Sequence, residues 1–88
     1  MDLRQLELFL AVIDTSSVTL AAQKMYITPG AVSLQLHNLA AELRTELFIR
    51  AGKRLQPTPN AHRLAGHARG IMNQVRQIEQ ELDRKSVV

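Results

Sequence analysis

A heptad pattern in the last third of the chain sets the strongest limit on how this sequence folds. From about Pro59 onward, apolar residues recur at alternating steps of three and four. This seam consists of Ala61, Leu64, Ala68, Ile71, Val75, Ile78 and Leu82. Such spacing over about three heptads is typical of a helix that pairs along one side with another helix. An 88-residue chain has too small a body to cover the whole seam, so we expect self-association. Packing of the seam on its own domain is the alternative.

The composition predicts one soluble, folded domain without disulfides. Hydrophobic residues make up 45% of the chain and charged residues 22%, and there is no cysteine. No apolar run approaches the ~20 residues that a membrane span requires. The first residues also lack the basic and then apolar order of a signal peptide. We therefore expect a cytoplasmic protein that does not enter a membrane.

Positive charge is concentrated in the second half of the chain. The net charge is +3 and the pI about 10.0. No acidic residue lies between Glu46 and Glu79, a span that holds six cations: Arg50, Lys53, Arg54, Arg63, Arg69 and Arg76. Such a run is either an ordinary solvated surface or the footprint of a polyanionic partner, if the fold gathers the cations on one side.

Two amphipathic helices are predicted in the first quarter of the chain. Apolar residues recur at helical spacing over residues 3–14, namely Leu3, Leu6, Phe9, Leu10 and Ile13. Arg4 and Gln5, at the entrance of this helix, are interpreted as solvated. Ser17 is a plausible N-cap for a short second helix, whose apolar face is Val18, Ala21, Ala22 and Met25. Tyr26 and Ile27 then form a turn.

A third helix is predicted over about residues 28–43. Thr28 can cap it, and Pro29 suits its first position because the missing N–H is not needed there. Its inner stripe is Val32, Leu36, Leu39 and Leu43, and its outer face is Gly30, Leu34, His37 and Ala41, flanked by Ser33 and Asn38. This outer face has no carboxylate before Glu42. Gly30 weakens the helix but leaves a bare backbone that another surface can approach closely.

A β-hairpin is predicted after the third helix. Residues 47–50 and 55–58 have strand character, and residues 51–54 have turn chemistry with Lys53 and Arg54 near the tip. Helix, short helix, turn, helix and hairpin together predict a mainly α fold, the winged helix-turn-helix. In that arrangement the third helix enters a DNA major groove, and the wing, at about 47–58, contacts phosphates or a minor groove.

Catalytic and metal-binding functions have little support. His62 and His67 are five residues apart, which places them on different faces of a helix rather than around one metal ion. His37 stands alone on the outer face of the third helix. We therefore expect no enzymatic activity, no metal and no cofactor.

Residues distributed along the whole chain carry a resemblance to a known family. They are Leu3–Leu6, Phe9, Ala11–Val12, Ser17–Ala22, Ala31–Ser33, Gln35, Leu39, Glu42–Leu43, Leu47–Phe48 and Arg50. As a set they resemble the N-terminal domain of LysR-type transcriptional regulators. The resemblance implies a DNA-binding domain over residues 1–58 and a linker helix for dimerisation over residues 59–88. It also implies a separate C-terminal domain, absent from this chain, that binds a small-molecule effector.

The resemblance assigns DNA contacts by position. On the third helix these are Thr28, Pro29, Gly30, Ser33 and Leu34, and at the wing they are Arg50, Lys53 and Arg54. Three further candidates come from their places on the helices: His37 and Asn38 on the outer face of the third helix, and Thr19 in the first turn of the second, which would face the backbone. Several positions depart from the family pattern, among them Pro59 and Ala61 at the entry to the linker helix. Leu34 stands where arginine is common, Pro29-Gly30 where Gln-Pro is common, and Arg44 where a glycine usually ends the helix. We therefore expect more reliance on backbone contacts, wing and DNA shape than on arginine readout.

The linker helix determines the expected partners. Dimerisation through Leu64, Ala68, Ile71, Val75, Ile78 and Leu82 would place two recognition helices on a two-fold axis. The expected partner is then double-stranded DNA with a palindromic or near-palindromic site, bound by a homodimer. For the full-length regulator, a tetramer is a further expected state. The alternative is a helix-turn-helix module that binds another protein through the coiled-coil helix.

Overall fold

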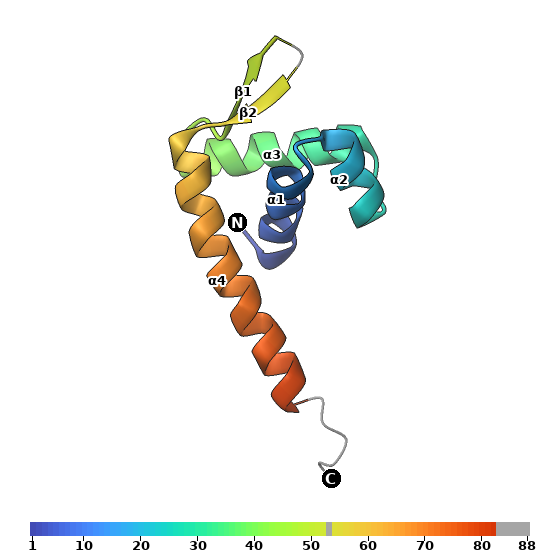
Figure 1. Cartoon of the computed structure of the whole chain (residues 1–88), viewed down its shortest axis with the longest axis vertical. Helices are drawn as coiled ribbons and strands as arrows, with labels where there is room; N and C mark the ends of the chain where they lie inside the picture. The colour runs from blue at the N-terminus through green and yellow to red at the C-terminus, as the bar shows by residue number, and fades with distance from the viewer. Residues whose placement is uncertain (53, 83–88) are drawn as a thin grey trace.

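The structure, a computed structural model, describes residues 1–52 and 54–82. Its elements are α1 (Leu3–Thr15), α2 (Val18–Met25), α3 (Pro29–Leu43), β1 (Phe48–Ala51), β2 (Arg54–Pro57) and α4 (Pro59–Leu82). The strands form an antiparallel hairpin beside one end of α3, and α4 runs from its base past α1 and away from the body (Figure 1). The predicted fold, a mainly α winged helix-turn-helix, is confirmed.

The hydrophobic core is built around α1, which packs against each of the other three helices. Phe9, at 0% exposure, lies at its centre with Leu8 and Val12. The predicted inner stripe of α3 is buried there as well at Val32, Leu36 and Leu39, while Leu43 is half-buried. The Phe9 and Phe48 rings meet with their centroids 5.7 Å apart. One aromatic pair therefore ties the wing to the helical body.

The helix boundaries follow from side-chain caps. Ser17 and Thr28 cap α2 and α3 as expected, with Ser17 Oγ accepting from the Leu20 amide and Thr28 Oγ1 from the Ala31 amide, each at 3.1 Å. Three helices end on a left-handed residue that is not glycine: Ser16, Tyr26 and Arg44. At Arg44, φ is 55°, so the chain accepts a strain of roughly 1 kcal/mol where glycine would avoid it.

The wing is displaced by one residue from the expected strands, because Leu47 and Thr58 have other roles. Leu47 is buried in the core, and strand pairing begins with Phe48 opposite Pro57. Thr58, expected in the second strand, instead caps α4. Its Oγ1 accepts from the Ala61 amide at 3.1 Å, and its backbone N–H donates to the Leu47 carbonyl at 3.0 Å.

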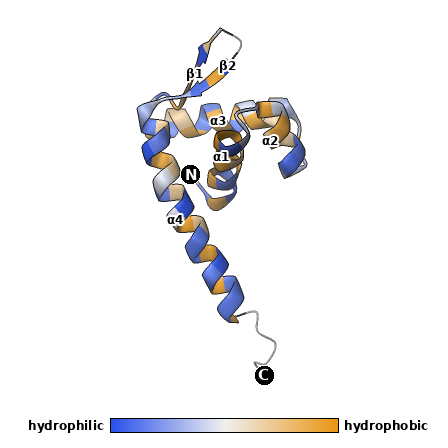
Figure 2. Ribbon diagram, in the orientation of Figure 1, coloured by the Kyte–Doolittle hydropathy of each residue, from blue (hydrophilic) through white to orange (hydrophobic). Residues whose placement is uncertain are grey.

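The heptad seam of α4 divides into two parts. Of its first three members, Ala61 and Ala68 are buried against the body and Leu64 is half-buried, so the alternative of packing on its own domain holds for the first part of the seam. Ala68, at 0% exposure, has no area left for a partner. Beyond it the apolar positions Ile71, Ile78 and Leu82 are exposed and Val75 is half-buried. Orange residues continue down the part of α4 that leaves the body (Figure 2). No helix in residues 1–52 and 54–82 could cross a membrane.

The first turn of α1 is not a solvated end, contrary to expectation. Gln5 is only 8% exposed, and its Nε2 donates to both oxygens of Gln35 on α3. Arg4 is exposed, but its Nη2 donates to the carbonyl of Met25, the last residue of α2, at 3.1 Å. Arg4 therefore ties α1 to the end of α2, and Gln5 ties α1 to the middle of α3.

Candidate nucleic-acid interface

The outward face of α3 is an uncharged, exposed surface. All seven residues expected to contact DNA from this segment are exposed: Thr28, Pro29, Gly30, Ser33, Leu34, His37 and Asn38. Leu34 is 58% exposed, although it is a large aliphatic side chain in a helix middle. The one carboxylate of α3, Glu42, accepts from the ammonium group of Met1 at 2.6 Å. Little on this face therefore repels a polyanion.

The beginning of α3 is open to close approach. A Cβ built on Gly30 would meet no other heavy atom within 4 Å. Its backbone angles are those of an ordinary helix, since φ is not positive there. Neither packing nor backbone conformation requires glycine at this position. What glycine provides is a first helical turn whose backbone an outside molecule can reach.

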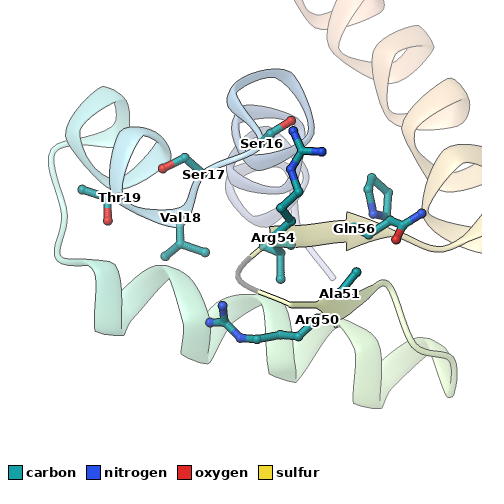
Figure 3. A pocket seen from close by; sticks show the side chains of 10 residues that line it. Ser16, Ser17, Val18, Thr19, Arg50, Ala51, Arg54 and Gln56 are labelled. Carbon is teal, nitrogen blue, oxygen red and sulfur yellow. The ribbon is translucent and has the colours of Figure 1, made fainter.

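A cleft lies between the start of α2 and the wing (Figure 3). Its volume is about 780 Å³, and one wall consists of Ser16, Ser17, Val18 and Thr19. Arg50 and Arg54 project from the wing into the same region, and none of the described residues that line it carries a carboxylate. Arg50 also lines the groove between the wing and α3, together with Ser33 and His37. The structure thus brings Thr19, Arg50 and Arg54 together beside α3, and Lys53 lies outside the described residues.

The remaining cations of the acid-free span are not gathered at this cleft. Arg69 donates to Asp14 of α1 at 2.7 Å, and Arg63 and Arg76 donate to asparagines on their own helix. The hydrogen bond from Arg69 holds the pKa of the Asp14 carboxyl below its ordinary value and raises the pKa of Arg69 itself. Of the cations described in this run, Arg50 and Arg54 therefore lie at the cleft beside the wing, whereas Arg69 and Arg76 line a groove with α1.

Sequence reasoning missed two features of this surface. Tyr26 was interpreted only as a turn residue, yet it is 94% exposed at the end of α2. The hydrogen bonds from Gln5 to Gln35 of α3 were missed as well, because nothing in the sequence indicates that a glutamine in a first helical turn is buried. Among the described residues, no group of three metal-binding side chains is present.

Comparison with known proteins identifies the family. Residues 3–62 match the family described as bacterial regulatory helix-turn-helix protein, lysR family. The chain belongs to the LysR family. Relatives within it include the Escherichia coli nitrogen assimilation regulatory protein nac, 35% identical over 79 residues. The uncharacterized HTH-type transcriptional regulator YbdO of the same organism is 39% identical over 74 residues. These matches cover 90% and 80% of the chain but 26% and 25% of the relatives, so the chain spans about a quarter of their length.

Solved LysR-family structures have the same fold. The BenM DBD in its complex with catB site 1 DNA superposes with a TM-score of 0.92 at 32% identity, covering 100% of this chain and 98% of that one. Full-length BenM, a regulator of Acinetobacter baylyi, gives 0.88 at 33% identity, and the match covers 29% of its length. The relatives named here are described as regulators or as their DNA-binding portions.

Proposed function

We propose that this chain is a sequence-specific double-stranded DNA-binding unit of a bacterial transcriptional regulator, acting in the cytoplasm and without enzymatic activity. Residues 1–58 read the DNA, and residues 59–88 are the linker helix for dimerisation, of which 83–88 lie outside the described residues. In this proposal α3 lies in the major groove with its amino end first, and the wing follows a phosphate backbone.

One observation carries the proposal. The exposed face of α3 bears no free carboxylate, and it lies beside a cleft whose charged side chains, Arg50 and Arg54, are both cationic. Cationic side chains at the cleft attract the negatively charged phosphates of DNA. A helix face without free carboxylates can approach the base edges without repelling the phosphates on either side. Thr28 and Thr19 stand at the first turns of α3 and α2, where hydroxyls and free backbone amides suit phosphate oxygens.

Site selection from a random duplex library, at low and at moderate salt, tests this proposal. We expect an interrupted two-fold motif, because two copies paired through α4 present two recognition helices. Binding that selects no sequence and vanishes with salt would restrict the fragment to phosphate contacts. A failure to bind at either salt concentration would contradict the proposal and favour the protein-interaction module.

Removing the two wing arginines tests the phosphate contacts separately. If Arg50 and Arg54 each neutralise one phosphate, Arg50→Ala with Arg54→Ala reduces the slope of log K against log salt by about 1.8. Affinity at low salt should fall at least tenfold, by rough estimate. Arg63→Ala with Arg76→Ala removes the same charge from α4 and is the matched control, with an unchanged slope expected. Equal slopes for the two double variants would contradict a role for the wing.

Leu34 is expected to read the DNA by apolar contact. Leucine cannot make the bidentate contact to guanine that is worth about 1–3 kcal/mol, but it can pack on a thymine methyl group. We therefore expect Leu34→Arg to shift the selected motif from thymine toward guanine at one position in each half-site. An unchanged motif in the same selection would show that residue 34 reads no base.

A further inference from the structure

The buried carboxamide of Gln5 has a fixed orientation. Its Nε2 donates to the backbone carbonyl of Gln35 at 3.3 Å and to the side-chain Oε1 of Gln35 at 3.1 Å. A backbone carbonyl can only accept hydrogen bonds, so the amino group of Gln5 must face it. Gln5 is 8% exposed, which leaves the side chain little freedom to turn away.

This orientation dictates the orientation of Gln35. Because Gln5 presents a donor, Gln35 must turn its oxygen inward, and its own amino group then points away from Gln5. Gln35 is an exposed residue of α3. The contact therefore presents two N–H donors outward from the recognition helix, with the rotamer of the side chain already selected.

The contact is poorly explained by stability alone. Within the described part of the chain, the buried Oε1 of Gln5 has no hydrogen-bond partner. A buried acceptor without a partner destabilises a fold, whereas an apolar side chain of the same length would pack here without that penalty. The amide at position 5 thus points to a task other than packing.

The position of Gln35 indicates what its donors meet. At about 100° per residue, it lies some 160° around the helix from Ser33, which lines the groove beside the wing. The two flanks of a helix in a major groove face the two phosphate backbones that border the groove. Gln35 lies beyond Asn38 on the side of α3 away from the wing, about 60° further from the centre of the outer face. Its long side chain extends from that side, where the nearer phosphate backbone is the one that the wing does not approach, and neutral N–H donors commonly bond phosphate oxygens.

We propose that Gln5 is a positioning residue for DNA binding: it holds the Gln35 carboxamide so that Nε2 donates to a phosphate on the flank of α3 away from the wing. This inference rests on the proposed function. Gln35 makes the phosphate contact. Gln5 lowers the entropy cost of binding, because the Gln35 side chain is already ordered before the DNA arrives.

The test is a double-mutant cycle on the whole 88-residue chain, with a fluorescent duplex of random sequence as the probe. Gln5→Met keeps the length of the side chain but removes both the donor and the unpartnered acceptor. We expect its free energy of unfolding to be unchanged or higher, while its affinity for the duplex falls about 3- to 10-fold. Leu8→Met, at a buried position of the same helix, is the matched control and should bind as the wild type does.

Three readouts decide the question. Gln35→Ala should weaken binding without changing the salt slope, because the lost donor is uncharged, and Gln5→Met should add little to it. In the free protein, ¹⁵N relaxation should show the Gln35 side-chain amide ordered in the wild type and mobile in Gln5→Met. Additive losses, an unchanged affinity of Gln5→Met, or an amide that stays ordered in that variant would overturn the inference while wild-type binding stands. Absence of wild-type binding would overturn the proposed function with it.

Discussion

Aspartate at both Ile71 and Ile78 should convert the proposed dimer into a monomer and weaken binding to the selected two-fold site by about 100-fold. Both side chains are exposed, Ile71 at 40% and Ile78 at 53%, so the charges should not disturb the core. The expected loss is large because two linked recognition helices bind far more tightly than one, without any additional contact. Sedimentation and anisotropy titration measure the two effects.

Matched charges elsewhere on α4 provide the control for this experiment. Gln77→Asp with Gln80→Asp adds the same charge to exposed positions off the seam, and we expect it to remain dimeric. Val75 is less suitable as a target, because it is half-buried and lines the groove between α4 and α1. If Ile71→Asp with Ile78→Asp stayed dimeric, the exposed seam would not be the interface.

Truncation of Phe9 should have the largest effect on folding. A fully buried phenylalanine reduced to alanine costs about 3–5 kcal/mol through lost transfer energy and the cavity left behind. At about 0.05–0.15 kcal/mol per residue, a chain of this size has about 4–13 kcal/mol in total, so the loss is a large fraction of it. We therefore expect Phe9→Ala to unfold at a much lower urea concentration than the wild type, in a titration at 25 °C followed by circular dichroism.

A smaller change at the contact partner separates folding from wing attachment. Phe48→Leu keeps an apolar side chain at a half-buried position and loses only the ring contact to Phe9. It should remain folded with a midpoint modestly below that of the wild type. A Phe9→Ala variant that unfolds at the wild-type urea concentration would contradict the placement of this ring at the centre of the core.

The helical part of the fold was predictable because local and periodic signals agree there. Ser17 and Thr28 are strong caps, and the inner stripe of α3 follows helical spacing closely enough to identify its outer face as well. The residues expected on that face are exposed as predicted. Their contacts with DNA stay predictions, as does dimerisation through α4.

The rest required tertiary information. Thr58 is followed by proline, as Thr28 is, but its neighbours have strand character, so the sequence predicted a strand there. In the structure Thr58 caps α4 and donates its N–H to the carbonyl of the buried Leu47, a contact that local sequence does not encode. The pairing of Arg69 with Asp14 joins residues 55 positions apart, which no periodicity encodes. The heptad pattern likewise marks an apolar side of α4 without saying that Ala68 faces its own body and Ile78 faces away.

Thr58 links the hairpin directly to the long helix α4, because one side chain bonds to both. Its hydroxyl donates to the Glu46 carbonyl at the foot of β1 while accepting from the first turn of α4. A change in the position of α4 would therefore act on the base of the hairpin through Thr58, whereas Phe48 holds the same hairpin to the body through its ring contact with Phe9. In the proposed dimer, the angle between the two linker helices would thus influence how each wing lies along the DNA.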